Sequence, residues 1–103
     1  MQEVAAYAKR VARTVLNTEI IVRFYASPHM IAVAAYRPGE LNLNKFRLGN
    51  EWFDLRANRL AIDDLLIHEF GHHYESNHLS ESYYDALTSI AAKFIAAARK
   101  GEL

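Results

Sequence analysis

The stretch from Asn58 to about Glu75 constrains the fold most strongly, because its apolar residues leave no polar stripe along a helix. At 3.6 residues per turn they point in nearly every direction around the axis: they are Leu60, Ile62, Leu65, Leu66, Ile67 and Phe70. A helix that is apolar all round is buried on most of its sides. We therefore expect a central helix, with Asn58 as its candidate N-cap, that the rest of the chain covers.

The two ends of the chain predict helices that supply part of this cover. Near the N-terminus, apolar residues recur at helical spacing and charged residues fall on the other face, which predicts an amphipathic helix from about 2 to 16. Near the C-terminus, Ser80 is the candidate cap of a last helix that runs to about Arg99. The inner stripe of that last helix is Tyr83, Leu87, Ile90, Phe94 and Ala97.

Three short segments between the first two helices predict strands. Glu19–Tyr25 and Ile31–Tyr36 are rich in β-branched and aromatic residues, and Glu40–Asn44 alternates between polar and apolar residues. Turn signals at Ser27–Pro28–His29 and Arg37–Pro38–Gly39 separate them. Two successive hairpins predict an antiparallel three-stranded meander whose last strand is an open edge. The expected fold is α+β, with an N-terminal helix, this sheet, a buried central helix and a C-terminal helix.

Composition limits the classes of function that fit the chain. Its 103 residues are enough for a single domain over 1–103. The absence of cysteine excludes disulfides and thiolate sites, and the balance of twelve basic and twelve acidic residues gives no general reason to expect an anionic partner. No apolar run approaches the ~20 residues of a membrane span, and the N-terminus lacks the pattern of a secretion signal. A cytoplasmic protein without a membrane partner is the default expectation.

A cluster of imidazoles lies on the predicted central helix. His68, Glu69, Phe70, Gly71 and His72 spell H-E-x-x-H. Residues four apart share one face of a helix, so two neutral imidazoles at this spacing can bind one Zn²⁺. Glu69 lies about 100° around the helix from His68, where it can reach a water on the open side of the metal. The motif predicts zinc ligands at His68 and His72, with Glu69 as the catalytic residue.

A catalytic zinc site needs a third protein ligand and an open fourth position. We favour His78, six residues after His72 and beyond the predicted helix end, where the chain can fold back. Glu81 and Asp85 at the start of the last helix are alternative ligands, and Glu75 is a weaker one because of its distance along the axis. Asp85 also suits a supporting role, in which its carboxylate accepts the second ring N–H of a ligand histidine.

The pattern H68-E-F-G-H72-x5-H78 resembles the zincin metallopeptidases, in particular the small SprT-like and WLM-type domains. In WLM-type domains a third histidine follows ten residues after the first, and an aromatic residue on the next helix corresponds to Tyr83 here. The likeness covers about Leu65 to Leu87. Metzincins carry glycine at the position of Glu75 and a methionine turn, which this chain lacks. The Gly-Pro that often precedes the third histidine in WLM domains is replaced by Ser76–Asn77.

The motif and the resemblance together predict a zinc-dependent metallopeptidase that acts on a peptide or protein substrate. Glu69 would act as general base toward the attacking water and then as general acid toward the leaving amine. An extended peptide would pair with the predicted edge strand Glu40–Asn44. The predicted oxyanion stabiliser is one of several side chains near the motif, and the sequence does not choose between them: they are His73, Tyr74, Tyr83 and Tyr84.

Other readings stay open at this stage. A non-catalytic module stabilised by zinc would use the same histidines with four protein ligands, but it leaves Glu69 without a task. A latent peptidase would be covered by its own tail, Ala96–Leu103, or completed by a partner chain or a larger parent protein. Trp52 and Phe53 close the core in our interpretation, and line a substrate pocket in the alternative one. A modest basic set gives slight support to nucleic-acid binding: Lys45, Arg47, Arg56 and Arg59.

Overall fold

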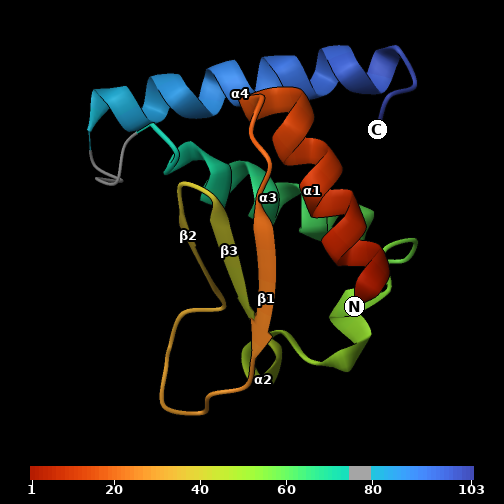
Figure 1. The fold of residues 1–103 in the computed structure, drawn as a ribbon, viewed down its shortest axis with the longest axis vertical. Helices are drawn as coiled ribbons and strands as arrows, with labels where there is room; N and C mark the ends of the chain where they lie inside the picture. Colours follow the sequence, from red (N-terminus) through yellow and green to blue (C-terminus); the bar gives the residue numbers. More distant parts are fainter. Residues whose placement is uncertain (75–79) are drawn as a thin grey trace.

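The computed structural model describes residues 1–74 and 80–103 and has an α+β fold (Figure 1). The predicted helix over 2–16 is confirmed, and so are the third strand and the C-terminal helix capped by Ser80, whose hydroxyl accepts a hydrogen bond from the Tyr83 amide. The elements are α1 (Gln2–Leu16), β1 (Ile21–Tyr25), β2 (Ala34–Arg37), β3 (Glu40–Asn44), α2 (Lys45–Leu48), the 3₁₀ helix η1 (Asn50–Phe53), α3 (Arg59–Gly71) and α4 (Glu81–Arg99).

The sheet is mixed, so the predicted antiparallel meander is wrong. The strand order is β1-β3-β2, with β1 parallel to β3 and β2 antiparallel to it. Only β2 and β3 form a tight hairpin, and Gly39 supplies the positive φ of its turn. Glu40–Asn44 is therefore the central strand rather than the predicted open edge, and β1 and β2 are the two edges.

The connection between β1 and β2 explains the error, because it is a wide loop rather than a second hairpin turn. Fully buried Asn44 holds this loop through its side-chain amide. Its oxygen accepts a hydrogen bond from the Ser27 amide, and its nitrogen donates to the carbonyls of Ser27 and Ala32. These bonds satisfy the buried amide. They also hold the β1–β2 loop in a wide conformation, so that β3 lies between β1 and β2.

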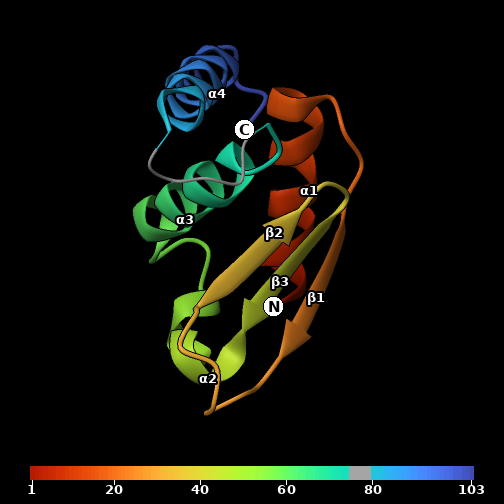
Figure 2. The same ribbon diagram turned by 90° about the vertical axis from the view of Figure 1, so that its left-hand side faces the viewer.

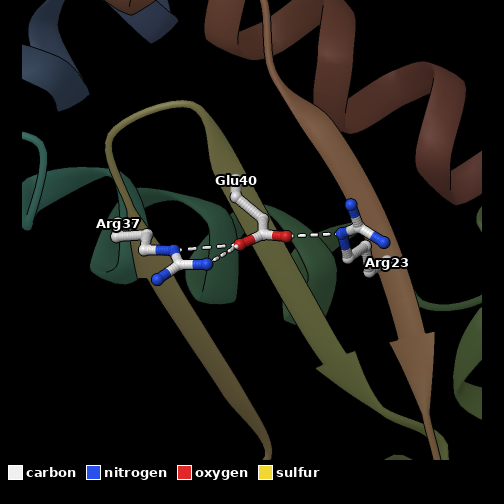
Figure 3. A network of polar contacts seen from close by, with 3 residues as sticks. All are labelled: Arg23, Arg37 and Glu40. Atoms are coloured by element: carbon white, nitrogen blue, oxygen red, sulfur yellow. Dashed lines mark hydrogen bonds and ion pairs between the residues drawn. The ribbon is translucent and has the colours of Figure 1, made fainter.

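On the outer face of the sheet, a charged bridge spans all three strands (Figure 3). Glu40 in β3 accepts hydrogen bonds from Arg37 in β2 and from Arg23 in β1. The Arg37 guanidinium, and with it Arg23, holds the pKa of Glu40 below its usual value. The bridge requires a strand order with β3 in the middle.

The core lies between the inner face of the sheet and the helices (Figure 2). α1 packs behind the sheet, and α4 runs across the ends of α1 and α3 (Figure 1). Leu41 and Leu43 of β3 are fully buried beneath these helices. Their burial stabilises the fold by roughly 1.5–3 kcal/mol for each side chain. In the described part of the chain, no helix has the length and apolar character needed to cross a membrane.

The helix α3 is buried on fewer sides than its sequence predicts. Ile62, Leu66 and Phe70 are fully buried, but Leu60 is 84% exposed. α1, β2 and α4 contact only part of its surface, so the remaining face meets solvent. The predicted helix end at about Glu75 is also wrong. α3 ends at Gly71, and His72 is its C-cap residue.

Candidate functional site

The H-E-x-x-H motif occupies the C-terminal end of α3 rather than its middle. His68 and Glu69 lie in the last turn, and the amide of the C-cap residue His72 donates to the carbonyls of Glu69 and Phe70. The imidazole rings of His68 and His72 have centroids 5.6 Å apart and planes at 84°. The two rings therefore lie next to each other on one side of the helix end, as the spacing predicts.

His68 is exposed and His72 is partly buried, whereas the sequence predicted a pair buried in an apolar helix. The side chain of His68 is 51% exposed. Glu69 is only 8% exposed, and its Oε2 lies 3.8 Å from Nε2 of His68. The carboxylate is thus sheltered by protein and adjacent to an accessible imidazole, which is the arrangement that a general base beside a ligand histidine requires.

Tyr83 of α4 fixes the end of α3. Its hydroxyl donates to the carbonyl of His68 at 2.8 Å and lies 3.4 Å from Nδ1 of the same residue. The last carbonyls of a helix have no partner within the helix, so this bond satisfies one of them. Burial, and to a smaller extent the charge of Glu69, raise the pKa of Tyr83, which keeps its hydroxyl protonated at neutral pH. The Tyr83 ring also packs against His72, with centroids 5.0 Å apart.

Gly71 permits this close contact between α3 and α4. A Cβ at position 71 would lie 2.9 Å from Cε1 of Tyr83 and 2.9 Å from Cδ2 of Leu87. Any side chain larger than a hydrogen atom would therefore push α4 away. Sequence analysis missed this role of Gly71, since only the packing of two helices reveals it.

Two of the three predicted metal ligands lie in the described structure. His78 and the alternative ligand Glu75 are outside the described residues. Within 1–74 and 80–103, no group of three or more histidine, aspartate or glutamate side chains is placed to hold a metal ion. The two described imidazoles lie next to each other, and their role as zinc ligands, like that of His78, remains a prediction from the sequence.

Asp85 and Glu81 lie on exposed positions of α4. In the described part of the chain no hydrogen bond joins Asp85 to a histidine, and Asp85 instead lines a pocket with Tyr74 and Lys93. Asp85 is two residues after Tyr83, or about 200° around the helix, so the two side chains point to different sides. Among the described residues it is Tyr83 that contacts His68.

The edge strand β2 lies beside the motif (Figure 2). A pocket of about 370 Å³ is bounded by β2, the following turn and His72. The Tyr36 hydroxyl is 2.9 Å from Nδ1 of His73, and the Tyr36 ring packs on Phe70 with centroids 5.3 Å apart. Burial raises the pKa of Tyr36. Tyr36 therefore connects the edge strand β2 to the end of α3. The sequence did not predict this contact.

A second pocket, of about 360 Å³, opens on the other two residues of the motif. Its lining residues come from the β1–β2 loop, α2, η1 and α3: they are Val33, Leu48, Trp52, Ala61, Asp64, Leu65, His68 and Glu69. The interpretation that Phe53 closes the core is confirmed, since Phe53 is buried. Trp52 is partly buried against the core, packs edge-on against Phe53, and also lines this pocket.

No protein-family model, no curated protein and no solved structure matches the chain. The function must therefore be argued from this geometry. A sheltered carboxylate, two accessible imidazoles and an edge strand meet at one end of α3, with a pocket on each side. In chemical terms, the carboxylate can move a proton, the imidazoles can bind a divalent metal, and the strand can align a peptide.

Proposed function

We propose that the protein is a zinc-dependent metallopeptidase similar to the SprT-like and WLM-type zincins. The observation that carries this proposal is the meeting of His68, Glu69 and His72 beside the edge strand β2. A purely structural histidine pair would need no accessible face, no adjacent sheltered carboxylate and no neighbouring strand edge.

The residues of the site fit a zinc ion. His68 and His72 would supply two nitrogen ligands, and His78 is the predicted third. The chemistry supplied by a zinc ion held there would be a lowered pKa of a water molecule, about 7, and polarisation of a carbonyl group. Tyr83 contributes by positioning, because its bonds to His68 hold the end of α3 against α4.

Glu69 carries the proton transfer in this proposal. Its carboxylate lies next to His68 and is shielded by the surrounding protein, so it can accept a proton from the attacking water. The same group then passes the proton to the amine that leaves. Positioned acid–base groups of this kind contribute about 10²–10⁴-fold to the rate.

The substrate would lie along β2, in place of the predicted strand Glu40–Asn44, which is central. The backbone N–H of Asn44 in β3 donates to the carbonyl of Val33, so Val33 and Asn44 form a hydrogen-bonded pair. Along β2 and β3, hydrogen-bonded and non-hydrogen-bonded pairs alternate from that position. By this alternation the backbone groups of Ala34 and Tyr36 point away from β3. An extended peptide can pair with them and cross the face of His72.

The test is the substitution Glu69→Gln, which keeps the shape of the side chain and removes its basicity. We expect the zinc-loaded variant to retain its metal and its melting temperature, and to hydrolyse an unfolded protein at least about 100-fold more slowly. His29→Gln is the matched control, because His29 is exposed and far from the motif in the sequence. Equal hydrolysis by wild type and Glu69→Gln would refute the proposal.

A further inference from the structure

The pocket beside Glu69 has apolar walls and an acidic rim. Its apolar lining includes Val33, Leu48 and Leu65, and the Trp52 side chain lines it as well. Its volume of about 360 Å³ exceeds that of any single amino-acid side chain. The pocket shares His68 and Glu69 with the proposed active site, so a substrate side chain next to the scissile bond can enter it.

Apart from His68, the ionisable side chains that line this pocket are carboxylates. Asp64 and Glu69 are its two carboxylates, and no lysine or arginine is among the lining residues. Glu69 is sheltered and is assigned to proton transfer, whereas Asp64 is exposed. In the described part of the chain Asp64 takes part in no hydrogen bond or ion pair. Its neighbour Asp63 is engaged by Tyr7 and Arg59 on another side of α3.

We propose that this pocket binds a lysine or arginine side chain of the substrate, and that Asp64 is the residue that selects it. The inference rests on the proposed peptidase function. A long basic side chain packs its apolar stem against apolar walls while it keeps its charged end at a polar rim. The face of Trp52 adds cation–π attraction, and the Asp64 carboxylate adds a charge partner.

A leucine or phenylalanine side chain would fill the same walls but gain nothing from Asp64. An acidic side chain would meet the like charge of Asp64 and bind worst. The pocket is therefore expected to prefer basic side chains over apolar ones, and apolar ones over acidic ones. The preference for basic over apolar side chains depends on the exposed carboxylate of Asp64.

Binding can be measured without turnover, because Trp52 is the only tryptophan in the chain and reports directly on the pocket. The probes are three end-blocked hexapeptides that differ at one position, which is arginine, leucine or glutamate. In the zinc-loaded Glu69→Gln protein, we expect the arginine peptide to change Trp52 fluorescence with a Kd about tenfold lower than that of the leucine peptide. Asp64→Asn removes this difference, and Asp64→Lys makes the glutamate peptide the tightest.

Glu3→Gln is the matched control, since it removes one exposed acidic charge at a separate pocket near the start of α1. It should leave the tenfold difference unchanged. Equal Kd values for the arginine and leucine peptides, or a difference that survives Asp64→Asn, would overturn the inference.

Cleavage by the wild-type protein separates this inference from the proposed function. Digestion of a peptide mixture should place lysine or arginine at one fixed position beside the cleaved bond, and Asp64→Asn should reduce this enrichment about tenfold. Cleavage without any basic preference overturns the inference and supports the peptidase. Arginine-dependent binding with no cleavage of any peptide supports the inference about the pocket and overturns the peptidase.

Discussion

The two ends of α3 both carry polar side chains, yet they are built differently. Near its start, the hydroxyl of fully buried Tyr7 donates to Asp63 at 2.6 Å, and the Arg59 guanidinium lies 4.2 Å from the centre of the Tyr7 ring. Arg59 is also 3.8 Å from Asp63. These three residues, the Tyr7 cluster, satisfy one another and join α1 to α3. At the other end, His68, Glu69 and His72 open onto two pockets and a strand edge.

The difference indicates what distinguishes a structural polar cluster from a candidate site. In the Tyr7 cluster the hydrogen bond from Tyr7 satisfies a buried hydroxyl group, and the partners lie on two packed helices. The motif end presents donors and acceptors toward a space that a ligand can enter. Substitutions in the Tyr7 cluster should therefore change stability and leave activity intact. Glu69→Gln should instead reduce activity and leave stability unchanged.

Tyr7→Phe gives the largest expected loss of stability. It removes a hydrogen bond to a charged group and should lower the free energy of unfolding by about 2 kcal/mol, with hydrolysis at low temperature unchanged. Chemical denaturation measures the loss. Tyr84→Phe removes an exposed hydroxyl and is the matched control, with no expected change. A loss of activity in folded Tyr7→Phe would break the comparison.

The same hydrogen bond has a predicted pH dependence. Burial, and next the bond to Asp63, raise the pKa of Tyr7 from 10.0 to about 12. Because the folded protein holds the proton more tightly than the unfolded chain, the stabilisation is complete below pH 10 and is lost as the pH rises toward 12. The stability difference between wild type and Tyr7→Phe should shrink over that interval.

Gly71→Ala should have a smaller effect on stability, but it should affect the candidate site as well as stability. The added methyl group collides with Tyr83 and Leu87, at a cost of about 1–3 kcal/mol, and the better helix propensity of alanine returns up to about 1 kcal/mol. Since Tyr83 holds His68, we also expect weaker zinc binding. Adding Leu87→Ala should recover part of the stability, and strictly additive losses would show that the two positions do not touch.

The three long helices were predictable from sequence because their apolar spacing and caps are local signals, whereas the short α2 and η1 were not predicted. Such patterns correctly predicted the limits of α1, the cap at Ser80 and the residues that form β3. The strand order was not predictable in this way, because it depends on Asn44 reaching back to Ser27 and Ala32. The sequence also placed the end of α3 too late, since the helix ends at Gly71, where Tyr83 and Leu87 of α4 lie close.

The relative placement of the two imidazoles was predictable, and their surroundings were not. The spacing of His68 and His72 correctly placed both rings on one side of the helix. The exposure of His68, the contact from Tyr83 and the pocket beside Trp52 depend on neighbours that are distant in the sequence. The edge strand was assigned to Glu40–Asn44, an error that followed directly from the wrong sheet topology.

Zinc content and coordination test the central claim most directly. The purified, metal-replete chain should hold one zinc ion bound by three imidazole nitrogens at about 2.0–2.1 Å, measured by elemental analysis and X-ray absorption. His68→Ala, His72→Ala and His78→Ala should each lower zinc affinity at least about tenfold, while His29→Gln should not. A chain that takes up no stoichiometric zinc, or that keeps its affinity in His78→Ala, would contradict the account.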